Sequence, residues 1–239
     1  MFKIFIRLSF CILIISSSIY AQRETVGAAF NQHSRNIDSL KTRSNIWSMS
    51  YRKELPSGTR LALALGLDYM KFIYNDSANP MLKSTNQIFI QLEGLQKIDF
   101  MYFKGAIQFY SIKGIAAEIT SGHSEVLHKN IYRIFEFPLS AGFTFPVDAF
   151  DFYVGLNKVY FYGTNEKEII VNNGGNKTSL GSSSRRTFQS ELGFGAEATL
   201  LYHFSDKLEF ELNIVKYEEK DFSARFSIWG PLKRMLYIN

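Results

Sequence analysis

Long stretches of the chain alternate apolar and polar residues with a period of two, which is the pattern of β-strands that have one apolar face. In the clearest stretch, 207–217, every second residue from Leu208 to Ile214 is apolar, and the residues between them are charged or polar. The same alternation recurs in four further stretches: 60–74, 100–112, 131–145 and 187–204. The pattern predicts an all-β protein.

Three features favour a membrane barrel over a soluble sandwich or a lipocalin-like barrel. Several stretches exceed the roughly nine to eleven residues that cross a bilayer at a tilt. Their polar faces carry Gly, Ala, Ser and charges, which suit a narrow polar lumen. Aromatic residues gather near strand ends, as interfacial girdles do: Tyr69, Phe72, Tyr74, Tyr160, Phe161, Tyr162, Tyr202 and Phe204. We therefore expect an antiparallel up-and-down transmembrane β-barrel, with these apolar side chains facing lipid: Leu63, Leu65, Phe137, Leu139, Phe194, Leu208, Phe210 and Leu212.

Short and long connections alternate along the chain. Tight turns are predicted at 54–58, 97–99, 146–149 and 205–206, and polar loops at 33–43, 75–86, 114–130 and 163–186. Outer-membrane barrels place short turns in the periplasm and long loops outside, with an even strand count. This rule gives about ten strands, with eight as the alternative, and puts both termini on the short-turn side. The expected strands are 24–32, 44–53, 60–74, 87–97, 100–113, 131–145, 151–163, 187–204, 206–217 and 222–230.

The first 21 residues have the composition of a secretory signal peptide. Lys3 and Arg7 precede an apolar run over 8–15, and Ala21 offers a small residue for cleavage. The remaining residues, 22–239, are expected to form a single barrel domain. Cys11 is the single cysteine and leaves with the leader, so no disulfide or thiol chemistry is expected. Removing the two leader bases lowers the formal net charge from +5 to +3, which is too mild to indicate a nucleic-acid partner.

One hairpin resembles a known family. The segment Tyr132–Leu139, followed by Phe152–Leu156, is similar to the central hairpin of the outer membrane β-barrel domain family. The resemblance implies a location in the outer membrane, contact with outer-membrane lipid, and insertion by the barrel-assembly machinery. Typical members have eight strands, so one hairpin, 87–113, would be extra here. Many such barrels end on an aromatic residue, whereas this chain ends on Asn239, and Pro231 interrupts its last strand.

Charged residues recur on the faces expected to point inward. Besides Arg52, they are Arg60, Asp68, Glu93, Lys104, Glu136, Glu191, Glu197, Glu209, Glu211 and Arg225. They could line a pore, or they could form a plug of ion pairs and hydrogen bonds. A ten-stranded lumen is narrower than that of a porin, and buried charges need partners, so we expect the plug. Arg225 and Lys104 are the expected partners of the four glutamates between 191 and 211.

A polar cluster at 122–128 contains residue types that occur in catalytic and metal sites. His123, Ser124 and Glu125 are the residue types of a hydrolase, and His128 adds a possible metal ligand. Catalytic triads usually assemble from separate elements, and the spacing differs from the His-Glu-x-x-His of metalloproteases. We expect solvated loop residues here, with no catalytic residue, metal ligand or cofactor.

The sequence thus predicts a non-enzymatic integral outer-membrane barrel with a structural or surface-interaction role. The outer loops are the expected contact surface for a ligand that the sequence does not identify. Two alternatives stay open. One is an outer-membrane enzyme, such as a protease or lipid-modifying hydrolase, and the other is a narrow channel for ions or small polar solutes.

Overall fold

The computed structural model describes residues 23–37, 40–73, 85–119, 124–173, 176–205, 208–217 and 221–232. The predicted signal peptide lies outside them. They form eleven strands: β1 (Arg23–Ile37), β2 (Leu40–Glu54), β3 (Thr59–Ile73), β4 (Thr85–Ile98), β5 (Met101–Ile119), β6 (Ser124–Val147), β7 (Phe150–Asn173), β8 (Asn176–Glu191), β9 (Gly195–Ser205), β10 (Leu208–Tyr217) and β11 (Phe222–Pro231). Among the described residues, no helix is long and apolar enough to cross a membrane.

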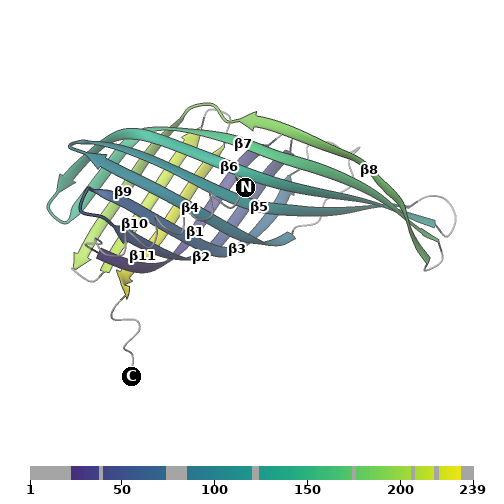
Figure 1. Cartoon of the computed structure of the whole chain (residues 1–239), viewed down its shortest axis with the longest axis horizontal. Helices are drawn as coiled ribbons and strands as arrows, with labels where there is room; N and C mark the ends of the chain where they lie inside the picture. Colours follow the sequence, from purple (N-terminus) through teal and green to yellow (C-terminus); the bar gives the residue numbers. More distant parts are fainter. Residues whose placement is uncertain are drawn as a thin grey trace, which may run out of the picture.

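The strands close into an antiparallel barrel with ten positions around the wall (Figure 1). Each strand from β1 to β7 pairs with the next, and β9, β10 and β11 lead back to β1. β7 is long enough to pair with two strands in succession on the same edge: β9 along Phe150–Asn157 and β8 along Tyr160–Asn173. β8 and β9 therefore share one position, and the predicted ten-stranded up-and-down barrel is confirmed.

The connections from β2 to β3, from β4 to β5 and from β6 to β7 lie at one end of the barrel with both described ends of the chain; it is called the short-turn end below. Arg23, where β1 starts, pairs with Glu54, where β2 ends, and Pro231 at the end of β11 pairs with Thr25. The turns after β4 and β6 contain Asp99 and Asp148, each with a positive φ. Tight turns need such conformations, and Asp tolerates them better than most residues.

The opposite end, called the extended end, differs from the expected set of long loops. Three of the four predicted loops are mostly strand: Ile37 pairs with Leu40, Ile119 with Glu125, and Asn173 with Asn176. The prediction of polar loops at 33–43, 114–130 and 163–186 is therefore wrong, while most of 75–86 lies outside the described residues. Strands β5–β8 instead continue together past the barrel as a sheet, which projects to the right in Figure 1. We call this projection, which consists of the described residues of 114–130 and 167–184, the extended sheet.

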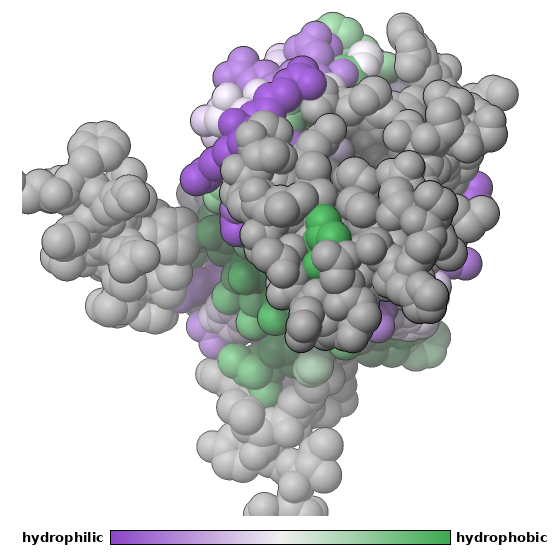
Figure 2. Space-filling view, turned by 90° about the vertical axis from the view of Figure 1, so that its right-hand side faces the viewer, coloured by the Kyte–Doolittle hydropathy of each residue, from purple (hydrophilic) through white to green (hydrophobic). Residues whose placement is uncertain are grey.

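An apolar belt covers the outer wall. Five of the predicted lipid-facing side chains are exposed, and three are half-buried on the same outer face; the exposed ones are Leu63, Leu65, Leu139, Phe194 and Leu212. The view from the extended end in Figure 2 shows hydrophilic described residues along the upper edge and hydrophobic ones lower on the wall. Phe161 is an exception among the predicted girdle aromatics, because its side chain points inward and is buried.

Aromatic side chains inside the barrel lie over glycines of the neighbouring strand. A Cβ placed on Gly195 would lie 2.7 Å from Cδ1 of Tyr217, its register partner on β10. Trp229 lies over Gly27, Phe188 over Gly163, and Tyr102 over the paired Gly142 and Gly155. Glycine offers no side chain for packing, and the ring supplies the contact that it lacks. These rings fill space that would otherwise be lumen.

Candidate functional site

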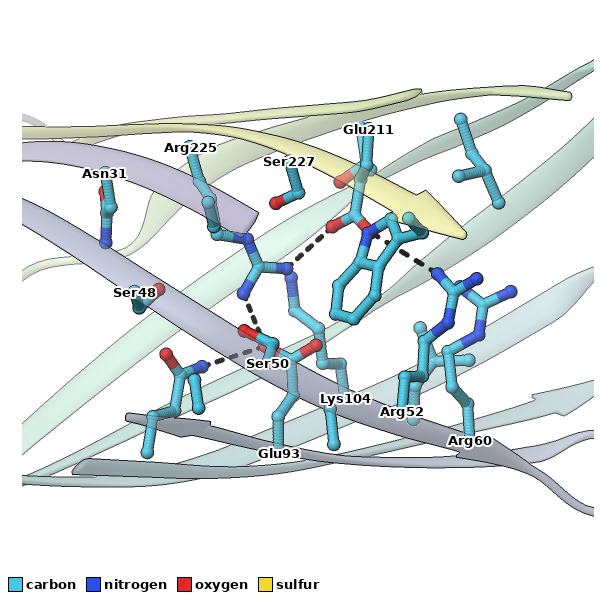
Figure 3. Close-up of a pocket in the computed structure, with 18 of the residues that line it drawn as sticks. Asn31, Ser48, Ser50, Arg52, Arg60, Glu93, Lys104, Glu211, Arg225 and Ser227 are labelled. Carbon is cyan, nitrogen blue, oxygen red and sulfur yellow. Dashed lines mark hydrogen bonds and ion pairs between the residues drawn. The ribbon is translucent and has the colours of Figure 1, made fainter. Parts of the chain in front are cut away.

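The centre of the lumen holds an arginine between two glutamates from opposite parts of the wall. Arg225 on β11 donates to Glu211 on β10 at 2.7 Å and to Glu93 on β4 at 2.9 Å (Figure 3). Gln91 also donates to Glu93, at 3.0 Å. The alternation of β4, β10 and β11 turns these side chains inward; Arg225 pairs with Glu211 on the neighbouring strand and with Glu93 across the lumen. All three charged side chains are less than one-fifth exposed.

A second arginine links this centre to the short-turn end. Arg52 on β2 forms ion pairs with Glu209 and, at 3.9 Å, with Glu211. Its guanidinium carbon lies 4.4 Å from the ring centroid of Trp229, a cation–π geometry. Arg52 is buried, so the two glutamates supply the compensating charge that a desolvated guanidinium needs.

A lysine on the facing wall neutralises another buried carboxylate. Lys104 on β5 forms an ion pair with Glu197 on β9. The amide of Asn213 donates to the same carboxylate at 2.6 Å, so Glu197 has both a charged and a neutral donor. Glu197 is fully buried, and its pair with Lys104 joins strands that lie three positions apart around the wall.

The short-turn mouth is closed by a ring of further pairs. Nδ1 of His203 lies 3.0 Å from Glu209, and Lys97 contacts Asp151 at 3.0 Å. Arg60 contacts Glu54 at 2.9 Å. Arg23 also forms an ion pair with Glu209. The mouth is therefore crowded with charges of both signs.

Toward the extended end, a buried polar cluster gives way to an apolar one. Glu136 pairs with Arg35 and accepts a hydrogen bond from Tyr110 at 3.1 Å, while Asp68 accepts one from Gln87 at 2.9 Å. Around them, apolar side chains from β3, β5, β6, β7, β8 and β10 pack inside the barrel: Met70, Tyr110, Ile134, Val159, Phe161, Phe188, Leu192, Val215 and Tyr217. This apolar cap leaves little space at the extended end of the lumen.

Two small cavities lie among these side chains in the lumen. One, of about 40 Å³, lies toward Trp229 and Arg60, and the other, of about 50 Å³, lies toward Tyr217 and Arg35. A buried water needs on the order of 10–15 Å³ by this measure, so each cavity holds a few waters at most. Both cavities border the same group, Glu93, Lys104 and Arg225, which separates them. Among the described side chains these cavities are small, and charged residues lie between them.

The lumen brings together nine of the ten charged residues that the sequence predicted: Arg60, Asp68, Glu93, Lys104, Glu136, Glu197, Glu209, Glu211 and Arg225. Glu191 is the exception, and its predicted inward orientation is wrong. The β-structure is interrupted at residues 192–194, which changes the phase of the alternation, so Leu192 is buried and Glu191 lies outside. There it forms an ion pair with Lys158 at 3.0 Å.

Sequence reasoning missed Arg35 and the apolar cap. Arg35 fell in a predicted loop, and Phe161 of the cap was assigned to an aromatic girdle. Residues 33–37 show no period-two alternation, so the sequence pattern carried no signal that Arg35 continues the strand inward. The cap could not be separated from the lipid belt by pattern alone, because both are apolar.

Features that would support catalysis or metal binding are few among the described residues. No group of three or more His, Cys, Asp or Glu side chains there could hold a metal ion. Of the predicted polar cluster, His123 lies outside the described residues. Ser124, Glu125 and His128 are placed in β6 by their backbone, opposite Asn173, Asn172 and Ile169.

Comparisons with known proteins support the fold and go no further. No family model matches the chain, and no curated protein matches its sequence. The translocator domain of autotransporter NalP from Neisseria meningitidis is similar in structure, with a TM-score of 0.54, 12% identity, and coverage of 95% of this chain and 96% of that one. The β domain of the Bordetella autotransporter BrkA has a TM-score of 0.46 and 7% identity, covering 88% of this chain and 100% of that one. The chain therefore has the fold of outer-membrane β-barrel domains, as the resemblance of its central hairpin predicted.

Proposed function

We propose that this chain is an integral outer-membrane protein whose sealed barrel anchors the extended sheet outside the cell as a contact surface. The exposed apolar belt supports placement in a bilayer, since soluble monomers rarely expose so large an apolar patch. The orientation follows the rule for such barrels, with short turns in the periplasm and longer elements outside. The role is structural or adhesive, without catalysis.

The length of the strands in the extended sheet carries this proposal. β6 and β7 have 24 residues each, whereas roughly nine to eleven cross a bilayer. At about 3.3 Å per residue the surplus amounts to ~40 Å of strand beyond the membrane. β6 and β7 stay paired from Phe150 to Asn173, so the projection is an ordered sheet. Many backbone pairs between β6 and β7 therefore lie in a region that is not required to cross the membrane.

The sealed lumen argues against transport as the main role. The name of the NalP domain describes a translocator, and translocation needs a passage. Here cavities of about 40 and 50 Å³ are separated by Glu93, Lys104 and Arg225. A steady current through the unmodified protein in planar bilayers would favour the channel hypothesis instead.

The orientation can be tested with single cysteines, because the mature chain has none. Thr187 is exposed on β8 toward the extended end, and Ser57 is exposed in the β2–β3 turn. In intact cells, a membrane-impermeant maleimide should label Thr187→Cys and leave Ser57→Cys unlabelled, and both should react after lysis. The reverse pattern would contradict the proposed orientation.

The contact role needs a variant that loses the projection and keeps the barrel. Replacing 114–130 and 167–184 by short turns removes the outer parts of β5–β8. Cells carrying the wild type should adhere to serum-coated glass or aggregate with one another more than cells with the shortened chain. A gel-mobility assay for the folded barrel is the control, and equal adhesion by both chains would refute the contact role.

A further inference from the structure

The outer wall carries a groove that small residues open across β4–β7. Its volume is about 740 Å³, and Gly94, Gly105 and Ala141 line its floor. Gly94 and Gly105 are register partners, so their missing side chains leave one continuous depression. The nearest side-chain atoms to a Cβ placed on them would be at 3.7 and 3.3 Å, both from leucines at the margins.

The sides of this groove are apolar and face outward with the rest of the belt. Phe103, Leu139, Leu156 and Phe194 border it, and each is at least 46% exposed. In a membrane such a surface meets hydrocarbon, so the natural occupant of the groove is an acyl chain. From β4 to β7 the groove crosses three strand spacings, or about 14 Å.

One end of the groove is charged. In register, Gly105 pairs with Leu139 and Leu139 pairs with Lys158, so the row of outward positions that includes the two glycines ends at this lysine. Lys158 forms its 3.0 Å ion pair with Glu191, and its ammonium lies 5.1 Å from the ring centroid of Phe194. The side chain of Glu191 is 57% exposed, so its carboxylate is open to a ligand.

The depth of this ion pair in the bilayer matters, because a charge on a lipid-facing surface raises the free energy of the folded protein. An outward Lys is costly near the bilayer midplane, and the cost falls toward zero near the interface. Tyr160 and Tyr162 follow Lys158 on the same face of β7 and are exposed. Such tyrosines mark the interface, so Lys158 and Glu191 lie near the headgroups and the groove descends from them into the hydrocarbon.

We propose that this groove binds a glycerophospholipid with a phosphoethanolamine headgroup, its phosphate on Lys158 and its ammonium on Glu191. The ammonium of Lys158 has three N–H donors and a carboxylate has about four acceptor sites, so both can bind the lipid while they stay paired. A phosphoglycerol headgroup offers no cation to Glu191, and the quaternary ammonium of phosphocholine cannot donate a hydrogen bond. The inference rests on the membrane placement proposed above, but is independent of the role of the extended sheet.

A second apolar groove, on the other side of the barrel, provides a matched control. It has a volume of about 430 Å³, and no charged residue lines it; Ala28 and Phe226 are among its margins. Filling it with Ala28→Leu should leave headgroup selection at the first groove unchanged. Filling the first groove with Gly105→Leu should abolish lipid retention there.

The test is native mass spectrometry of protein released from vesicles containing equal amounts of phosphatidylethanolamine, phosphatidylglycerol and phosphatidylcholine. The wild type should retain one phosphatidylethanolamine with about tenfold preference, the factor that a charge-assisted contact can supply. Lys158→Met and Glu191→Gln should each reduce this preference to near unity, and Ala28→Leu should keep it.

Two results would overturn the site: equal retention of the three lipids by the wild type, or undiminished selection in both Lys158→Met and Glu191→Gln. Both positions lie on the outer face of the wall, and the gel-mobility assay for the closed barrel checks each variant. Failure of the wild type to insert into vesicles at all would instead refute the membrane placement, so the two failures are distinguishable.

Discussion

The sharpest test of the sealed lumen is the removal of Arg225. Arg225→Met keeps most of the side-chain volume and removes the charge that sits between Glu93 and Glu211. Breaking a buried pair by removing one partner usually costs 3–5 kcal/mol, because the other partner is left as an uncompensated buried charge.

The structure places the expected loss near the lower part of that range, about 3 kcal/mol. Glu211 keeps a distant partner in Arg52, at 3.9 Å, and Glu93 keeps the hydrogen bond from Gln91. The side chains of Arg225, Glu93 and Glu211 are 17%, 16% and 9% exposed, so water screens the pairs little. Neutralising both acids as well, in Arg225→Met with Glu93→Gln and Glu211→Gln, should restore most of the stability.

Equilibrium urea unfolding in phospholipid vesicles, followed by tryptophan fluorescence and gel mobility, would measure these free energies. Arg133→Met is the matched control, because Arg133 pairs with Glu166 at 3.1 Å while 44% exposed, and such surface pairs contribute about 0–1 kcal/mol. The reasoning fails if Arg225→Met costs no more than Arg133→Met, or if the triple variant is no more stable than the single one. Planar-bilayer recordings of Arg225→Met would show whether the two cavities then join.

Three further changes test other parts of the wall by the same unfolding assay. Gly195→Val should cost about 1–3 kcal/mol, since its side chain would clash with Tyr217, and a cost as small as that of Ala28→Val on the open outer face would contradict this. Leu65→Arg should cost about 2–4 kcal/mol if Leu65 lies near the bilayer midplane, and a neutral result would place it elsewhere. Phe188→Ala should cost about 3–5 kcal/mol through loss of packing in the apolar cap, and unchanged unfolding would show that the cap is loose.

The barrel itself could be predicted because the bilayer imposes a strict pattern on it. Lipid on one side and a narrow polar lumen on the other force successive residues such as Leu208 and Glu209 to alternate in character. The even strand count followed from the alternation of connection lengths. Ten positions are confirmed, even though the predicted strand 187–204 proved to be two strands, β8 and β9.

The strand ends were misplaced where the membrane stops imposing that pattern. Beyond the bilayer both faces of a sheet can meet water, so polar residues occupy both and period two disappears. The stretch 176–184 was therefore predicted as part of a polar loop, although its backbone pairs with β7. Composition indicated turns at sites where cross-strand pairing, a long-range property, decides the structure.

The orientation of Glu191 shows a second limit. Alternation predicts a face only while the strand is continuous, and a break of three residues at 192–194 resets the phase. No residue in that stretch indicates that the strand is interrupted, because Gly193 is also compatible with an ordinary strand. The same uncertainty applied to Phe161, whose aromatic ring suits a girdle or a packed lumen equally well.

The two kinds of packing inside the barrel depend on each other. Ion pairs such as Arg225–Glu211 and Lys104–Glu197 gain strength where water is excluded, because the local dielectric constant is low. The apolar cap around Phe188 and Tyr217 excludes water from the extended end, and the cavities beneath it hold few waters. Apolar residues alone could not line the whole lumen, because a strand apolar on both faces would lose the alternation that orients it in the membrane. Charges that pair inside the lumen keep that alternation, and the cap excludes water from them, so a lumen filled in this way is compatible with strands that stay oriented in the membrane.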